Sequence, residues 1–142
     1  MIDFKKYETV AAKLTSAANA LWNKVTFITV ADILAGDVDL TGLDKKCWEL
    51  MDVNSNAMRS LSKEVDSVPE DEYFEKYEDL HNATENLLYQ SSDKLNAIDI
   101  IISAFREIEY KADEDNFKDK FGDIQQINLG ESVIRLERIT ML

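Results

Sequence analysis

The strongest constraint on the fold is a run of apolar residues between positions 4 and 28 that recur at alternating spacings of three and four. Because an α-helix turns once every 3.6 residues, this spacing places them along one side of a helix. The members are Phe4, Tyr7, Ala11, Leu14, Ala18, Leu21, Val25 and Ile28. Only four glycines and one proline interrupt the 142 residues, which favours long helices over many short strands.

The end of this first helix is ambiguous. A stretch rich in β-branched residues around Thr26 weakens helix propensity, so the helix either breaks there or runs through. Thr29 and Asp32 have the spacing of a capping box for a short helix over 30–35, which Gly36 would end.

A second apolar stripe indicates a helix over 43–65, for which Thr41 and Asp44 have capping-box spacing. Its members are Leu43, Cys47, Leu50, Asn54, Ala57, Leu61 and Val65. We expect Cys47 to be a small buried residue rather than a reactive thiolate. Asn54 either lies at the edge of the stripe or fixes the register of a bundle, and the edge position is the commoner outcome.

The stretch PEDEYFEKYEDLH (69–81) has the signals of a third helix start. Ser67 is a candidate cap, Pro69 suits the first turn, and Glu70 takes the capping-box position. The acidic residues then fall in the first turns, where the positive end of the helix dipole favours each by about 0.3–1 kcal/mol. Tyr73, Phe74, Tyr77, Leu80, Leu87 and Leu88 are expected to supply its apolar side.

The apolar pattern continues far enough to predict one long helix over about 70–112. Unbroken, it would be roughly 65 Å long at 1.5 Å per residue, more than the two earlier helices could cover. Either a kink near Ser91 folds it back, or a second copy of the chain buries it. The final segment, 131–142, suits a helix or a strand. Together these elements predict a single all-α domain over 1–142, an antiparallel helical bundle of about four to five helices.

Charge limits the partners of the protein. The formal net charge is −12, and most of the excess lies in two blocks, 64–79 and 107–123. Such a chain repels nucleic acid and anionic lipid, so we expect no direct nucleic-acid or membrane binding and a protein partner with a basic surface. A single cysteine and no signal-peptide pattern predict a cytoplasmic protein.

Catalytic and metal motifs are weak. Glu78 and His81 have the E-x-x-H spacing of di-iron bundles, but the chain has no second histidine, so no metal or other cofactor is expected. Glu72-x-x-Glu75 has the spacing of magnesium-dependent helical nucleotide hydrolases, without a clear partner motif on the later helix. That activity is the least favoured alternative, and the absence of nucleophile and phosphate-loop motifs favours a non-catalytic protein.

Protein–protein interaction is therefore the predicted function. Carboxylates in rows can imitate phosphates, as small acidic helical inhibitors carried by viruses do, so we expect an inhibitor or adaptor that binds a basic, nucleic-acid-handling protein. The predicted partner-binding residues are Glu70, Asp71, Glu72, Glu75, Glu78 and Asp79. The alternative is a homo-oligomeric structural or assembly protein, such as a homodimer, paired through the helix at 70–112.

Overall fold

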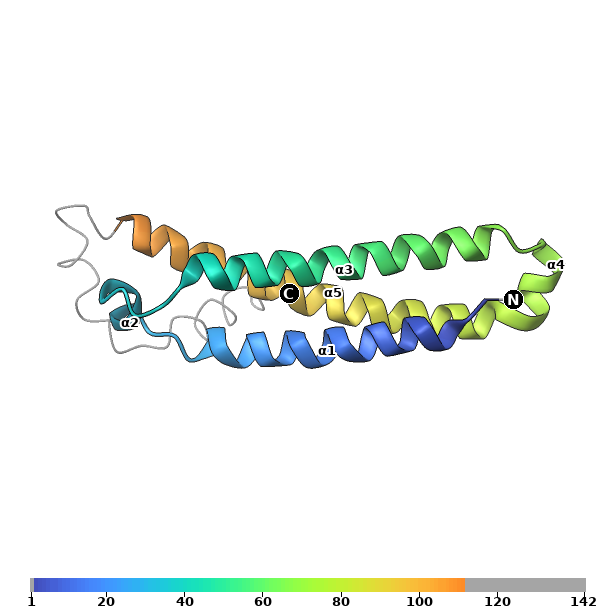
Figure 1. Ribbon diagram of the computed structural model, residues 1–142, viewed down its shortest axis with the longest axis horizontal. Helices are drawn as coiled ribbons and strands as arrows, with labels where there is room; N and C mark the ends of the chain where they lie inside the picture. Colours follow the sequence, from blue (N-terminus) through green and yellow to red (C-terminus); the bar gives the residue numbers. More distant parts are fainter. Residues whose placement is uncertain (1, 112–142) are drawn as a thin grey trace, which may run out of the picture. The chain divides into compact units, whose positions relative to one another are not determined.

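The computed structural model describes residues 2–111, which are all-α (Figure 1). In chain order the elements are α1 (Phe4–Thr26), α2 (Val30–Leu34), α3 (Leu40–Asp66), α4 (Glu70–Glu72), the π-helical turn η1 (Tyr73–Tyr77) and α5 (Glu78–Lys111). Because α4, η1 and α5 follow one another without a break, they form one long helical segment. The predicted all-α fold with a long third helical segment is confirmed. Within 2–111, no helix is long and apolar enough to cross a membrane.

The chain divides into two compact units, and α1, α3 and α5 each contribute residues to both. The first unit comprises Met1–Asn19 and Trp48–Leu95. Within it, α3 runs antiparallel to α1 and to α5 (Figure 1). Its buried apolar side chains are Ile2, Phe4, Tyr7, Ala11, Leu14, Ala18, Leu50, Leu61, Tyr77, Leu88 and Leu95. The stripe predicted for the first helix therefore forms the core face of α1.

Three polar side chains are buried in the first unit, and each has a hydrogen-bond partner. Asn54 of α3 is only 2% exposed, and its Nδ2 donates to the backbone oxygen of Leu88 in α5 at 2.9 Å. The hydroxyls of Ser91 in α5 and Thr15 in α1 lie 3.1 Å apart, and Thr84 Oγ1 donates to a backbone carbonyl one turn earlier. The predicted edge position of Asn54 is wrong. Its bond between helices would be lost if α3 shifted along α5, so it favours this register.

The structure bears on one of the two predicted alternatives for the long helical segment, the kink near Ser91. α5 is continuous through Ser91, so the kink predicted there is absent, and the irregular turn is η1, near the start of the segment. Ile100 and Tyr110 of α5 are exposed, whereas five apolar residues beyond Ser91 are buried within one chain, so that burial requires no second copy. The buried residues are Leu95, Ile98, Ile101, Ile102 and Phe105.

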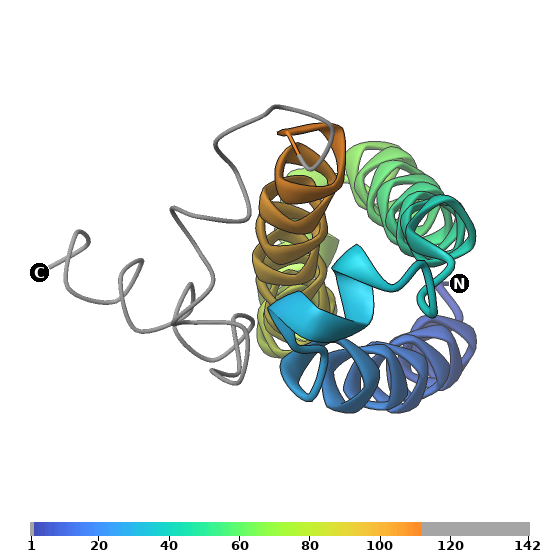
Figure 2. The same cartoon turned by 90° about the vertical axis from the view of Figure 1, so that its left-hand side faces the viewer.

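The second unit comprises Ala20–Cys47 and Asn96–Leu142, of which 20–47 and 96–111 are described. In Figure 2, α2 lies across the space between this unit's parts of α1, α3 and α5. The buried apolar side chains are Leu21, Val25, Ile28, Val30, Ile33, Leu40, Cys47, Ile98, Ile101, Ile102 and Phe105. An ion pair of 2.7 Å between Arg106 Nη1 and an Asp44 carboxylate oxygen joins α5 to α3.

The connection between α1 and α2 follows the sequence signals. α1 ends at Thr26, so the first helix breaks there. The Asp32 amide donates to Thr29 Oγ1 at 3.2 Å, and the Thr29 amide donates to Asp32 Oδ2 at 3.0 Å, which confirms the capping box. Gly36 follows α2 with φ of 74°, a conformation that glycine adopts without steric cost.

The other two predicted caps are wrong. α3 begins at Leu40, and Asp39 Oδ1 accepts the Gly42 amide at 3.0 Å, so Asp39 occupies the capping position assigned to Thr41. Asp44 is thereby left to pair with Arg106.

Ser67 does not cap the third helical segment. Its hydroxyl donates to the backbone oxygen of Glu64 at 2.7 Å, at the end of α3. Pro69 takes the N-cap position of α4, and its carbonyl accepts the Tyr73 amide at 2.9 Å. The predicted segment 131–142 and most of the acidic block 107–123 lie outside the described residues.

Candidate protein-binding surface

The six predicted partner-binding residues lie in one continuous helical segment, 70–79, which we call the acidic turn. α4 supplies Glu70, Asp71 and Glu72, η1 supplies Glu75, and α5 supplies Glu78 and Asp79. Glu72 is partly buried and the other five are exposed. The fold thus keeps these carboxylates together and leaves most of them in solvent.

Few of these carboxylates are neutralised by the protein itself. Within residues 2–111, Glu72 is the member of the acidic turn that forms an ion pair, with Lys76 at 4.0 Å. Both side chains remain in contact with solvent, so this pair contributes little to stability. Asp71, Glu75 and Asp79 are spaced four residues apart, which places them on one side of the helical segment. The result is a row of unpaired negative charges.

The π-helical turn η1 sets the direction of the aromatic residues in the acidic turn. The Glu78 amide bonds to the Tyr73 carbonyl five residues earlier, which adds one residue to that turn of the helix. Tyr77 is buried, and its ring lies 5.8 Å from that of Phe4. Phe74 is 56% exposed, so its predicted place on the apolar side is wrong. A large apolar side chain therefore stands among the carboxylates.

His81 belongs to a small hydrogen-bonded chain of side chains. Its Nδ1 lies 2.8 Å from the Tyr73 hydroxyl, and its Nε2 lies 3.2 Å from a Glu85 carboxylate oxygen. Burial, followed by the negative charges of Glu78 and Glu85, raises the pKa of Tyr73. His81 therefore pairs with Glu85 one turn later rather than with Glu78, the residue at E-x-x-H spacing.

The described residues do not gather metal ligands. Among residues 2–111, no three His, Cys, Asp or Glu side chains are arranged to hold a metal ion. Glu72, part of the spacing noted for magnesium-dependent hydrolases, faces Lys76 instead.

Glu64, the first acid of the block 64–79, has a different environment from the acidic turn. It accepts a hydrogen bond from the Tyr7 hydroxyl and pairs with Lys6 Nζ at 3.1 Å, so it joins α3 to α1. The Tyr7 bond, aided by Lys6, lowers the pKa of the Glu64 carboxyl, although burial opposes that shift. Burial raises the pKa of Tyr7, and its bond to Glu64 raises it further. Glu64 is thus engaged within the fold.

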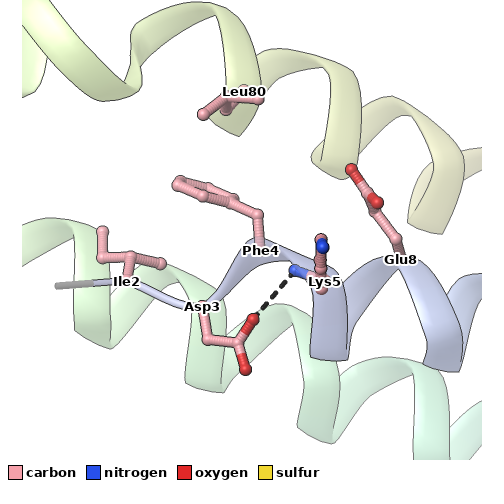
Figure 3. A pocket seen from close by; sticks show the side chains of 6 residues that line it. All are labelled: Ile2, Asp3, Phe4, Lys5, Glu8 and Leu80. Carbon is pink, nitrogen blue, oxygen red and sulfur yellow. Dashed lines mark hydrogen bonds between the residues drawn. The ribbon is translucent and has the colours of Figure 1, made fainter.

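An open groove of about 480 Å³ lies in the first unit, where Leu80 of α5 faces the start of α1. Figure 3 shows Leu80 opposite Phe4, with Ile2 before α1 and the Glu8 side chain directed toward α5. Ile2 and Phe4 are buried, whereas Leu80 is 47% exposed. Leu80 was predicted to belong to the apolar side of its helix, and in the structure it forms a wall of this groove.

The sequence alone did not reveal this groove. Leu80 is an apolar residue directly after the acids Glu78 and Asp79, and Ile2 precedes the stripe of the first helix. Neither position specifies a groove until the start of α1 is placed beside α5.

Cys47 is fully buried in the second unit, as predicted. Burial, and secondarily the charges of Asp99 and Asp44, raises the pKa of the Cys47 thiol to about 11. A thiol in this environment is protonated at neutral pH and reacts slowly.

Comparisons with models of protein families, with curated proteins and with solved structures find no match to this chain.

Proposed function

We propose that this protein is a non-catalytic inhibitor or adaptor that acts by protein–protein interaction, binding through its acidic turn to a basic surface of a nucleic-acid-handling protein. The observation that carries this proposal is the contrast in pairing among acids. Glu64 and Asp44 are paired with cations inside their units, whereas five of the six acids in the acidic turn are exposed and have no ion pair within residues 2–111. None of these five carboxylates is neutralised by a cation of the described residues.

Electrostatics favours such a partner. A row of carboxylates offers lysine and arginine side chains the kind of contact that backbone phosphates offer, and the net charge of −12 speeds encounter with a cationic surface. Exposed Phe74 adds an aromatic side chain, a residue type common at the centre of protein interfaces. Binding through such a surface should weaken steeply with salt.

Affinity capture from a lysate treated with nuclease, at low and high salt, tests this function. The wild-type chain should retain a basic nucleic-acid-handling protein at low salt and release it at high salt. The variant Asp71→Lys/Glu75→Lys/Asp79→Lys should lose that protein at both salts while its circular dichroism stays helical.

A matched control distinguishes the effect of charge in the acidic turn from the effect of the net charge of the protein. Glu49→Lys/Asp52→Lys/Asp93→Lys changes the net charge by the same amount at exposed positions of the first unit outside the acidic turn. It should keep the partner. Equal retention by both triple variants contradicts the proposed binding surface.

The homo-oligomeric alternative has one specific observation in its favour. In the first unit, α3 exposes Trp48 and Val53, and α5 exposes Leu87 and Tyr89, each by more than two fifths. Pairing between copies could cover these side chains. Analytical ultracentrifugation distinguishes the two functions, because the assembly protein should be a dimer or larger at every salt concentration and the adaptor should be a monomer.

A further inference from the structure

The groove beside Leu80 combines apolar walls with carboxylates at its rim. Ile2, Phe4 and Leu80 supply the apolar surface, and the Phe4 ring is backed by the ring of Tyr77. Asp3 and Glu8 also line the groove, and Asp79 directly precedes Leu80 in α5. An apolar depression that is also lined by two carboxylates is suited to a side chain that is itself apolar and flanked by cations.

The cations near this groove are mostly engaged elsewhere. Lys6 pairs with Glu64, and Lys76 faces Glu72. Lys5 lines the groove, and its ammonium group forms no ion pair with a residue in 2–111. The carboxylates of Asp3 and Glu8 likewise have no ion pair there, so the described side chains that line the groove carry a net negative charge.

On the basis of the proposed function, we infer that this groove receives one aromatic side chain of the basic partner, held between lysine or arginine residues that reach the carboxylates of Asp3 and Glu8. Three observations select this occupant. The groove volume of about 480 Å³ accommodates a large side chain, the Leu80 wall opposite Phe4 is apolar and half exposed, and the carboxylates that line the groove attract cations. In this arrangement the carboxylates of the acidic turn attract the basic partner, and the groove selects partners by the side chain that they place in it.

Two labelled peptides test this inference directly: Lys-Arg-Trp-Arg-Lys and the matched Lys-Arg-Ala-Arg-Lys. Burial of the indole should make the tryptophan peptide bind the wild-type chain about tenfold more tightly in fluorescence anisotropy. Leu80→Ser should reduce binding of the tryptophan peptide to the level of the alanine peptide. Leu80 is half exposed, so this change should leave the helix content unaltered.

Two further variants sharpen the test. Leu87→Ser changes an equally exposed leucine two turns later in α5, outside the groove, and should keep the tenfold preference. Lys5→Glu removes the cation that lines the groove and should tighten binding of both peptides.

The outcomes separate this inference from the proposed function. Equal affinity of the two peptides for the wild-type chain, or a preference that survives Leu80→Ser, contradicts binding of an aromatic side chain in the groove. Neither result contradicts binding by the acidic turn. Undiminished binding of both peptides to Asp71→Lys/Glu75→Lys/Asp79→Lys overturns the acidic turn as the binding surface.

Discussion

The first unit uses polar side chains in two opposite ways. In its interior, Asn54, Thr84 and Ser91 are buried and fully hydrogen bonded, and two of them link neighbouring helices. In the acidic turn, the carboxylates are exposed and largely without partners in the described chain. The interior groups therefore specify how the helices pack, whereas the acids contribute charge without fixing any contact.

This difference indicates which polar residues should affect binding and which should affect folding. A buried polar group must keep its partner, because losing it leaves an unsatisfied donor or acceptor. An exposed acid has no such constraint, so substitution should change binding much more than folding. Glu64 has properties of both groups. It is acidic and partly exposed, but it is bonded to Tyr7 and Lys6.

The largest expected effect on stability comes from Asn54→Asp. It removes the donor to the Leu88 carbonyl and places a carboxylate in the core, which should cost about 3 kcal/mol or more of unfolding free energy at pH 7. Urea unfolding measures the loss. Asn56→Asp, the same chemical change at an exposed position of α3, should stay within about 0.5 kcal/mol. Similar losses in both variants would contradict a structural role specific to Asn54.

A smaller effect is expected for Glu64→Gln. A charged acceptor for Tyr7 and Lys6 becomes neutral, which should cost about 1 kcal/mol. Asp66→Asn, at an exposed acid at the same end of α3, is the matched control and should be nearly neutral in the same urea titration. If the control loses as much stability, helix-end charge rather than the contact with α1 accounts for the effect.

The pH dependence of that difference follows from the lowered pKa of Glu64. A carboxyl whose pKa is lower in the folded state stabilises the fold fully above its unfolded pKa of about 4.3, and this contribution disappears as pH falls through the folded value. The gap in stability between wild type and Glu64→Gln should therefore be constant near neutral pH and shrink below about pH 4. A gap that widens on acidification would give the pKa shift the opposite sign.

The smallest effect on stability is expected in the acidic turn. Glu75→Gln/Asp79→Asn removes two unpaired charges, which relieves repulsion between acids four residues apart and weakens their favourable interaction with the start of the helix. These terms oppose each other, so thermal unfolding should show a change within about 0.5 kcal/mol. A loss of 2 kcal/mol would show that these acids take part in the fold.

The sequence was sufficient for the helices but not for the contacts between them. Spacings of three and four predicted α1 and most of α3, and local signals predicted the cap at Thr29 and left a break at Thr26 as one of two alternatives. These features depend on residues within one or two turns of each other. The partner of Asn54 could not be predicted, because it depends on which carbonyl of α5 lies opposite and hence on the register of two helices.

The candidate site could likewise be predicted only in part. The acids of 70–79 are identifiable by composition, but the orientation of their aromatic neighbours depends on η1. The extra residue of that π-helical turn shifts the helix phase, so Tyr77, Thr84, Leu88 and Ser91 face inward while Phe74 is exposed and Leu80 forms a wall of the groove. The pattern of apolar residues predicts that the leucines are buried and that Thr84 and Ser91 are exposed. It carries no information about the hydrogen bonds that these two hydroxyls form inside the unit.

The salt dependence of partner binding, measured for the wild-type chain and for Asp71→Lys/Glu75→Lys/Asp79→Lys, is the most direct test of the acidic turn as a docking surface. The account predicts that the logarithm of the wild-type association constant falls steeply with the logarithm of salt concentration, and that the variant binds weakly with a shallow slope. An affinity and a slope that the triple substitution leaves unchanged would contradict it, and the interaction would then have to be made by another surface.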